Sequence, residues 1–421
     1  MYKIYFTFVQ LVLLNVIIKT FVMKNAFLEL YFNHKNRGAY LMQQNKTRVL
    51  FLVNIPAPYR VDFFNELGKL CDLTVLFESG ESIEREQSWL SNNFINFKAI
   101  FLKGIKIKNS TLSFDVIKYL KKNLFDIIVI GGYSTPTGML AIEVLKLKKI
   151  PFILNSDGGI LSNESNIKFM IKKHFISSAS YWLSTGKKTN EYLVNYGADE
   201  GNIYIYPFTS LSEKDLLKST LDKLTKKKYK ENLSIDYDKC ILSVGQVIHR
   251  KGFDVLLNSI SRIPKEIGVY IIGGIPPEEY LKIVHELSLS NVHFLSFKSK
   301  NELKKYYMAS DLFVLPTRED IWGLVINEAM AHGLPVITTD KCNAGLELVK
   351  DFDNGYLVQV DNSDTLANKI EKILYDDIVS ERMAIRSLKK IRRFTIENMA
   401  IETNKIFETI LKKRDNNGKY K

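Results

Sequence analysis

The sequence predicts an α/β protein with two domains, each built around a doubly wound parallel sheet. Apolar runs of strand length alternate with segments of helical period along most of the chain, and this alternation is typical of parallel sheets. The chain has 421 residues, which is too long for one ordinary hydrophobic core. A polar, lysine-rich stretch at residues 214–238 separates two apolar-rich blocks, so we place the linker there.

Composition narrows the class of protein. Hydrophobic residues make up 46% of the chain and charged residues 25%, which describes a globular protein. The formal net charge of +13 favours an anionic partner: a membrane surface, a phosphorylated substrate or nucleic acid. Nucleic acid is disfavoured because the chain has no basic-aromatic module or finger. Cys71, Cys240 and Cys342 lie far apart, which predicts reduced thiols in a cytoplasmic setting.

The N-terminal segment, residues 1–45, stands apart from the rest. Residues 4–18 are almost entirely apolar, but Lys19 interrupts them before the roughly 20 residues that a membrane span needs. No small-residue cleavage site follows, so the segment is a poor signal peptide. Three interpretations stay open: a short membrane anchor, an interfacial helix, or an extension upstream of a natural start at Met42. None places a catalytic residue here.

The first domain is expected to span residues 46–213. Its opening elements are predicted as a strand at 49–53, a turn-rich loop at 54–60, a helix at 61–70 and a strand at 73–77. The loop would lie at the ligand edge of the sheet, where Tyr59 and Arg60 are available to an acceptor. An equally weighted interpretation is that its two prolines only rigidify a turn.

A second strand-to-helix unit follows at residues 126–146. The strand at 126–130 ends in Gly131 and Gly132, and the helix begins at Pro136 with Thr135 as its N-cap. A glycine pair at a strand end lets a ligand or another backbone approach closely. The chain has no GxGxxG or GxxxxGK[ST] pattern, so dinucleotide-dependent and P-loop enzymes lose their main support.

Asp157 is the candidate catalytic carboxylate of the first domain. The strand at 152–155 ends in the sequence SDGG, and a carboxylate at the carboxyl end of a strand is well placed in a cleft. The alternative is an Asx-turn that closes a loop. Residues 166–181 then mix basic and apolar side chains, which suits an anionic membrane surface but is more often a solvated helix face. Strands and a helix at 181–184, 187–196 and 203–206 complete the domain.

The second domain, expected at residues 239–395, opens with a strand at 240–244, a turn at Gly245 and a helix from about residue 252 to 260. The turn before that helix carries His249, Arg250 and Lys251. Cations beside a helix N-terminus make a diphosphate site, in which Arg binds oxygens directionally and Lys acts as a point charge. Taken alone, an Arg-Lys pair such as Arg250 and Lys251 usually lies in a solvated turn.

An acidic motif follows the strand at 312–315. A polar loop at 317–321 leads into a helix from Gly323 to His332, and the N–H groups of Gly323, Leu324 and Val325 would point toward an anion. Asp320 and Glu328 bracket this helix start. Ionised carboxylates only accept hydrogen bonds, which suits them to the hydroxyl pairs of a ribose or hexose. The plain alternative for Glu328 is a solvated helix face.

The remaining elements are predicted at the following residues: strands at 269–272 and 292–295, and helices at 363–375, 378–393 and 396–412, the last within a closing segment, 396–421, that ends in a polar tail. Phe297 and Lys298 follow one of these strands. The two D-x-D patterns, at 236–238 and 351–353, are interpreted as solvated turns, so no metal site is expected.

The motif TREDIWGLVINEAMAHGLPVITTD, residues 317–340, closely resembles the donor-site signature of the family-four glycosyltransferases (glycosyl transferases group 1). IPAPYRVDFFNELGK, residues 55–69, resembles the opening of the same family, whose members are retaining enzymes of the GT-B fold. The resemblance runs from about residue 49 to 411. It implies two Rossmann-like domains facing a cleft and a closing helix that packs back on the first domain.

The resemblance also implies a role for each candidate residue. Glu328 would hold the ribose, Asp320 the sugar hydroxyls, and Asp157 would flank the anomeric centre. Arg250 and Lys251 would bind the diphosphate. The full donor-binding set is Gly245, Arg250, Lys251, Phe297, Lys298, Gly323, Leu324, Val325 and Glu328.

Two departures from the family pattern stand out. Asp320 occupies the place of the usual Glu, with Glu319 beside it; we favour Asp320 because only its spacing to Glu328, seven intervening residues, matches. Gln246 replaces a usual Arg, which shifts phosphate contact onto Arg250 and Lys251, of which only Lys251 occupies the family's usual lysine position.

The expected function is a metal-independent, retaining transfer of a sugar from a UDP- or GDP-sugar to a saccharide or lipid-linked acceptor, in surface polysaccharide synthesis. No cofactor is expected. The protein would work in the cytoplasm, with peripheral contact at the inner face of the cell membrane. Two alternatives stay open: a nucleotide-sugar 2-epimerase of the same fold, and a catalytically silent, membrane-associated scaffold of a polysaccharide assembly complex.

Overall fold

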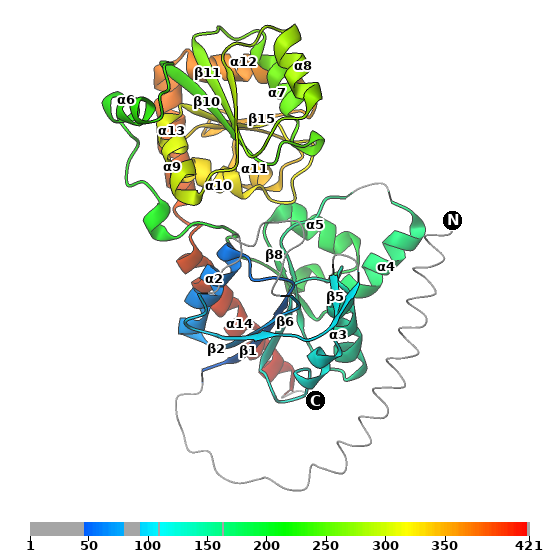
Figure 1. Cartoon of the computed structure of the whole chain (residues 1–421). Coiled ribbons are helices and arrows are strands. Elements are labelled where there is room, and N and C mark those ends of the chain that lie inside the picture. Colours follow the sequence, from blue (N-terminus) through cyan, green and yellow to red (C-terminus); the bar gives the residue numbers. More distant parts are fainter. Residues whose placement is uncertain (1–45, 80–92, 108–109, 162–163, 419–421) are drawn as a thin grey trace, which may run out of the picture.

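The computed structural model describes residues 46–79, 93–107, 110–161 and 164–418, arranged as two α/β domains (Figure 1). The prediction for residues 1–45 therefore lies outside the described residues. None of the helices in the described ranges combines the length and the hydropathy needed to cross a bilayer.

The first domain is a seven-stranded sheet in the order β3-β2-β1-β6-β7-β8-β9, with every pairing parallel. Its strands are β1 (Arg48–Val53), β2 (Asp72–Phe77), β3 (Lys98–Phe101), β6 (Ile127–Ile130), β7 (Ile153–Ser156), β8 (Tyr181–Ser184) and β9 (Ile203–Ile205). A small antiparallel pair, β4 (Ile105–Ile107) and β5 (Ser110–Leu112), stands beside it. The helices are α2 (Pro58–Leu70), α3 (Pro136–Leu147), α4 (Asn166–Ile176) and α5 (Lys187–Asn195).

Both faces of this sheet are buried, which explains why its strands are continuous apolar runs. Along β1, Val49, Phe51 and Val53 belong to one core cluster, while Leu50 and Leu52 belong to another on the opposite face. A parallel sheet covered by helices on both sides needs such runs. Thr135 caps α3 as predicted, since its hydroxyl accepts from Gly138 N at 3.1 Å.

The second domain is a six-stranded parallel sheet in the order β12-β11-β10-β13-β14-β15. Its strands are β10 (Lys239–Val244), β11 (Ile267–Ile272), β12 (Val292–Leu295), β13 (Leu312–Leu315), β14 (Val336–Thr339) and β15 (Gly355–Val358). The strand order reverses between β10 and β13, just as it reverses between β1 and β6 in the first sheet. In open α/β sheets, ligands bind at such a switch point, beyond the carboxyl ends of the strands.

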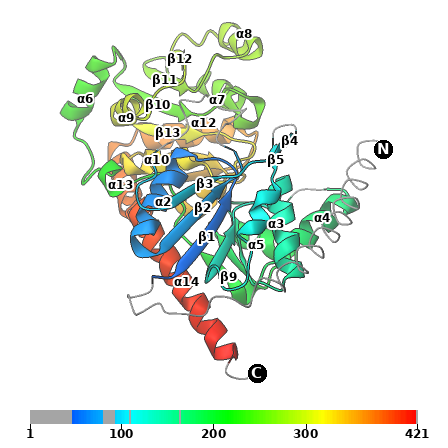
Figure 2. The same ribbon diagram turned by 60° about the horizontal axis from the view of Figure 1, so that its bottom comes forward.

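The helices from the linker onward are α6 (Lys223–Asn232), α7 (Phe253–Ile260), α8 (Glu278–Glu286), α9 (Lys300–Ala309), α10 (Leu324–Ala331), α11 (Asn343–Leu348), α12 (Ser363–Leu374), α13 (Asp377–Ile391) and α14 (Ile396–Gly418). Figure 2 shows α14 returning from the second domain to lie along α2 of the first. Phe407 of α14 meets Phe51 of β1, with ring centroids 6.3 Å apart. This last helix therefore ties the two domains together.

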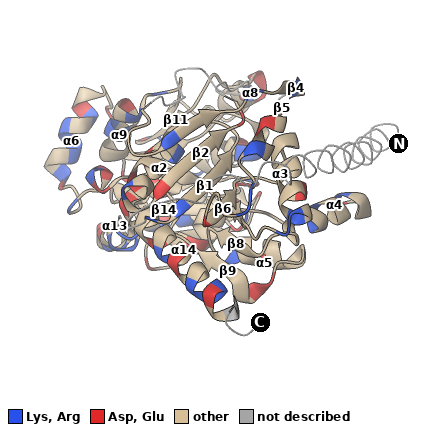
Figure 3. Ribbon diagram, turned by 90° about the horizontal axis from the view of Figure 1, so that it is seen from below, with Lys and Arg blue, Asp and Glu red and all other residues tan. Residues whose placement is uncertain are grey.

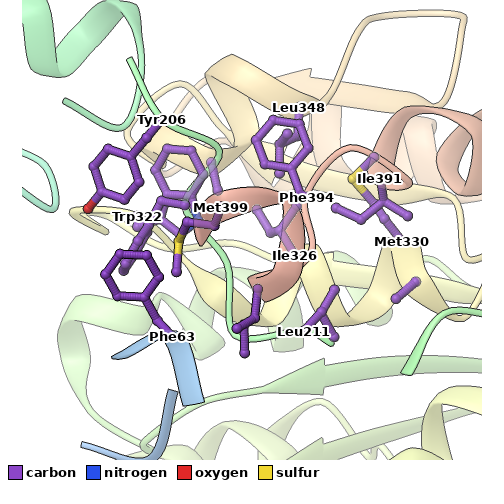
Figure 4. Packing of buried hydrophobic residues seen from close by; sticks show 14 of the residues in the cluster. Phe63, Tyr206, Leu211, Trp322, Ile326, Met330, Leu348, Ile391, Phe394 and Met399 are labelled. Carbon is purple, nitrogen blue, oxygen red and sulfur yellow. The ribbon is translucent and has the colours of Figure 1, made fainter. Parts of the chain in front are cut away.

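One hydrophobic cluster runs across the domain junction. It contains Phe63 of α2, Tyr206 of the crossing segment, Trp322, Ile326 of α10 and Met399 of α14 (Figure 4). Because α10 carries the candidate donor residues, this shared core fixes the distance between the donor helix and the first domain.

The structure corrects several element boundaries. Helix α2 begins at Pro58, so Tyr59 and Arg60 lie in its first turn and not in the loop predicted at 54–60. Proline is favoured at this position because the first helical N–H has no partner within the helix and proline presets φ. The strands β3 and β15 and the helices α8 and α9 were not predicted. The closing helix runs on through Gly418, beyond the predicted end at 412.

Candidate active site

The cationic turn after β10 and the loop after β13 are joined by four hydrogen bonds to backbone carbonyl oxygens. The carbonyl oxygen of Arg250 accepts from Arg318 N at 2.8 Å and from Thr317 Oγ1 at 3.0 Å. Arg318 Nη1 donates to His249 O at 2.7 Å, and Arg250 Nη1 donates to Glu319 O at 2.6 Å. These bonds hold the turn and the loop together at the switch point of the second sheet.

Lys251 and Asp320 form an ion pair at the same switch point, with Nζ 2.5 Å from Oδ2. Their side chains are only 11% and 14% exposed, so the pair is largely shielded from water. A Cβ on Gly245 would lie 3.3 Å from Lys251 Cε, so any larger residue there would crowd the lysine. Glu319 instead is exposed, and the contact recorded for it is through its backbone oxygen. Of the two neighbouring acids, Asp320 is the one that faces Lys251.

The helix α10 begins at a glycine that no other residue can replace without strain. Gly323 has φ 97°, in the left-handed region, and an added Cβ would lie 2.8 Å from Cys342 Sγ. Within the described residues, no acceptor is recorded for the N–H groups of Gly323, Leu324 and Val325. These N–H groups carry the positive end of the helix dipole and suit an anion.

Glu328 lies just over one turn into α10, at the junction with the first domain. Its carboxylate accepts from Tyr307 Oη at 3.0 Å and from Ser210 Oγ at 3.3 Å. Burial raises the pKa of Glu328 above its usual value, although the Tyr307 hydroxyl works against that shift. Ser210 belongs to the segment that crosses from the first domain, so one carboxylate touches both halves of the protein.

Asp157 follows β7 and is held by several donors. It pairs with Arg60 and accepts from Asn155 Nδ2 at 2.8 Å and from Tyr206 Oη at 3.3 Å. The Arg60 side chain is only 7% exposed, and its guanidinium carbon lies 5.5 Å from the ring centroid of Phe208. The structure thus places Arg60 as the partner of Asp157, while its predicted role toward an acceptor stays a prediction.

The loop that carries Asp157 touches the second domain. An added Cβ on Gly158 would lie 2.2 Å from Ile321 O, and Asn343 Nδ2 donates to Gly159 O at 3.3 Å. Asn327 Nδ2 likewise donates to Phe208 O at 3.2 Å. The carboxyl edges of the two sheets therefore face each other across this contact.

Tyr59 lies beside Arg60 on the ring of Phe208, while Phe297 and Lys298 follow β12. The ring of Tyr59 packs against Phe208 at 5.8 Å. Phe297 is 70% exposed, and it follows β12, two strands away from β10 in the sheet order. Two strand spacings amount to about 10 Å, a separation that leaves room for a nucleoside between this edge and the turn at Arg250.

Sequence reasoning missed three polar groups at these edges. Tyr307 and Ser210 contact Glu328, and Glu78 lies buried, 5% exposed, directly after β2. Glu78 accepts from Thr135 Oγ1 at 2.6 Å, and burial raises its pKa to about 7. The sequence does contain a signal for the helix that carries Tyr307. Ser299 and Glu302 form a capping box, the usual signature of a helix start, at the beginning of α9.

Two doubly wound domains with facing carboxyl edges, a polar site at the switch point and a last helix returning to the first domain are the features of the GT-B fold. Comparison with solved structures agrees. Alr3699/HepE of Anabaena, in complex with UDP, matches with a TM-score of 0.71 at 17% identity, over 86% of this chain and all (100%) of that one. A glycosyltransferase of Rickettsia africae matches with a TM-score of 0.69 at 18% identity, over 87% and 99%.

Sequence comparison finds similarity to one family of glycosyltransferases. Residues 225–390 match the family model of the glycosyl transferases group 1. An uncharacterized glycosyltransferase of Methanocaldococcus jannaschii is 28% identical over 41% of this chain and 45% of its own length. The N,N'-diacetylbacillosaminyl-diphospho-undecaprenol alpha-1,3-N-acetylgalactosaminyltransferase of Campylobacter jejuni is 21% identical over 76% of this chain and 83% of its own length. Residues 225–390 of this chain are therefore similar to the group 1 glycosyltransferases.

Proposed function

We propose that this protein is a retaining glycosyltransferase that moves a sugar from a nucleoside-diphosphate sugar to a saccharide or lipid-linked acceptor during surface polysaccharide synthesis. The names of its relatives support the pathway. They include the Campylobacter enzyme above, the lipopolysaccharide core biosynthesis glycosyltransferase LpsE of Rhizobium meliloti, and the capsular polysaccharide biosynthesis glycosyltransferase CapM of Staphylococcus aureus.

The observation that carries the proposal is the hydrogen-bonded contact between the turn after β10 and the loop after β13, at the switch point of the second sheet. There Lys251 pairs with Asp320 at 2.5 Å, beside the N–H groups at the start of α10, which have no acceptor in the part of the chain that the structure describes. A diphosphate that enters would take Lys251 as its counter-ion and release Asp320 to accept from sugar hydroxyls. Arg250 lies in the same turn and adds a second cation. Glu328, farther along α10, would accept from the ribose hydroxyls.

In this reaction the bond from the anomeric carbon to the diphosphate oxygen breaks, and the acceptor oxygen bonds to the same face of that carbon. The acceptor proton passes to the departing phosphate oxygen. Asp157 would flank the anomeric centre from the first domain. Arg250, Lys251 and the dipole of α10 would neutralise the leaving diphosphate, so we propose turnover without a metal ion. A chelator such as EDTA should leave the rate unchanged.

A UDP-sugar is the donor to test first, with GDP-sugars second. Structural neighbours of this fold include the Anabaena protein in complex with UDP and with UDP-glucose. The exposed Phe297 and the neighbouring Lys298 would seat the base.

Peripheral contact with the inner face of the cell membrane belongs to the same proposal. Helix α4 carries Lys168 and Lys173 together with the side chains of Ile167 and Met170, which are 44% and 62% exposed. Figure 3 shows basic positions of α4 in blue. Cations and apolar side chains on one exposed helix suit an anionic bilayer surface. A flotation assay with anionic vesicles tests this contact.

The deciding experiment incubates the protein with radiolabelled sugar nucleotides and a membrane extract. Label in lipid or polymer supports transfer. Label in an altered free sugar nucleotide supports a 2-epimerase instead, and neither product, with no nucleotide binding, supports a silent scaffold. Glu328→Ala should abolish turnover without loss of folding, because the expected loss is at the ligand. Turnover that survives this change would refute the ribose assignment.

A further inference from the structure

The carboxylate of Glu328 is held on one side by a rigid pair of rings. Tyr307 of α9 donates its hydroxyl to Glu328 Oε2 at 3.0 Å, and its side chain is only 1% exposed. The ring of His332 lies flat against the ring of Tyr307, with centroids 5.1 Å apart and planes 8° apart. Two stacked, buried rings have no room to turn, so the Tyr307 hydroxyl is fixed in place.

His332 is itself anchored to the backbone of Glu328. Its Nδ1 lies 2.7 Å from Glu328 O, and because a carbonyl oxygen only accepts, Nδ1 must carry the proton. Burial lowers the pKa of His332 to about 4, so the ring is neutral at physiological pH. Its Nε2 is buried without a partner in the described residues. The neutral His332 ring therefore acts as a packing surface for Tyr307 and not as an acid or base.

The other oxygen of Glu328 faces the first domain and has a weaker partner. Ser210 Oγ lies 3.3 Å from Oε1, near the upper limit for a hydrogen bond between oxygens. A ribose hydroxyl is the same chemical group as the serine hydroxyl. It can replace Ser210 at Oε1 without leaving the carboxylate short of a donor.

We propose that Tyr307, braced by His332, is a positioning residue for donor binding: it fixes Oε2 of Glu328 so that Oε1 points toward the hydroxyl pair of the nucleotide ribose. This inference rests on the proposed function, in which Glu328 binds the ribose. Without the tyrosine hydroxyl, only the weaker bond from Ser210 would hold the carboxylate of Glu328, because the last torsion of the side chain has a broad energy profile. Donor binding would then have to order it.

The main test is Tyr307→Phe, which keeps the stacked ring and removes only the hydroxyl. Because the ribose is bound alike before and during the reaction, donor KM should rise while kcat changes little. A lost hydrogen bond to a charged group predicts a rise of about tenfold. The matched control is Tyr280→Phe, since Tyr280 is equally buried in α8, with no partner for its hydroxyl among the described residues. It should leave donor KM unchanged.

Ribose analogues separate positioning from a general loss of structure. The dissociation constants of UDP and 2',3'-dideoxy-UDP (or of the GDP pair, if the wild type prefers GDP) are measured by calorimetry for the wild type and both tyrosine variants. Tyr307→Phe should weaken UDP about tenfold and leave the dideoxy analogue within about twofold. Equal weakening of both nucleotides, or of neither, would overturn the inference.

Two further variants complete the design. His332→Phe keeps a flat ring against Tyr307 and should retain donor KM, whereas His332→Ala removes the brace and should raise it; equal KM values would count against the brace. Glu328→Gln reports on the proposed function itself. If Glu328→Gln leaves UDP affinity unchanged, the ribose assignment fails. If it weakens UDP while Tyr307→Phe does not, only the positioning role fails.

Discussion

Lys251 Nζ lies 2.5 Å from Asp320 Oδ2, and this ion pair joins the ends of two strands, β10 and β13, that are 68 residues apart in the chain when counted from Val244 to Leu312. The pair lies at the switch point of the second sheet, where the strand order reverses. Under the proposed function, Lys251 would bind the phosphates and Asp320 the sugar, so the two groups neutralise each other until the donor binds.

This pairing predicts opposite effects for two substitutions. Asp320→Asn frees the Lys251 ammonium, so UDP should bind more tightly while kcat/KM for the sugar donor falls. Lys251→Met should weaken UDP by about 10- to 100-fold, as expected for a lost bond to a charged group. Calorimetry with UDP and steady-state kinetics measure the two quantities. Lys228→Met, on the exposed face of α6, is the control for net charge and should change neither. Weaker UDP binding by Asp320→Asn would contradict the prediction.

Arg60 and Asp157 form the corresponding pair in the first domain. Arg60→Met should lower the free energy of unfolding by about 2–4 kcal/mol, because it leaves Asp157 without its cation and empties the space beside Phe208. Denaturant titration measures the loss. The control is Arg48→Met, which breaks an ion pair with Asp126 whose side chains are 45% and 35% exposed, and should cost less than about 1 kcal/mol. Similar losses in both variants would show that Arg60 contributes no more than a surface charge.

Gly323 predicts a stability loss that arises from backbone conformation. Gly323→Ala places a Cβ 2.8 Å from Cys342 Sγ at φ 97°, so we expect a loss of about 1–3 kcal/mol. Gly132→Ala is the matched control, since a Cβ there meets nothing within 4 Å, and it should stay within about 0.5 kcal/mol of the wild type. Equal stability of the two variants in urea would rule out strain at Gly323.

Glu78 predicts a dependence of stability on pH. Burial raises its pKa from the usual 4.5 to about 7, so the folded protein holds this proton more tightly than the unfolded chain. Its contribution is therefore fully present below pH 4.5 and is lost as the pH rises to about 7. Linkage puts the loss at up to about 3 kcal/mol.

Replacing the ionisable group should remove that part of the pH dependence. In Glu78→Gln the free energy of unfolding should fall less between pH 5 and pH 8 than in the wild type, as measured by urea titration at both values. Glu286→Gln, at an exposed position in α8, should follow the wild type. A Glu78→Gln profile parallel to that of the wild type would show that Glu78 titrates normally.

The order of strands and helices was largely readable from the sequence, because apolar runs and helical periods are local properties of the chain. The glycines and prolines that end these elements are local as well. Helix α9, which carries Tyr307, was not predicted, because a short helix that is rich in lysine has no clear apolar period. The edge strands β3 and β15 were missed because each has only four residues, and so short an apolar run does not distinguish a strand from a buried helix segment.

By itself, the sequence determined that two parallel-sheet domains form and that cations and acids follow particular strands. Both features can be predicted from local patterns of residues and from a family motif. Only the tertiary structure decided which of those strand ends meet. Lys251 pairs with Asp320, and Arg60 pairs with Asp157. Glu328 lies between Tyr307 and Ser210. These pairings depend on the order of strands in each sheet and on the packing of the two domains, which are set by contacts between residues far apart in the chain. Those contacts depend on side-chain packing across the whole fold, which no local pattern records.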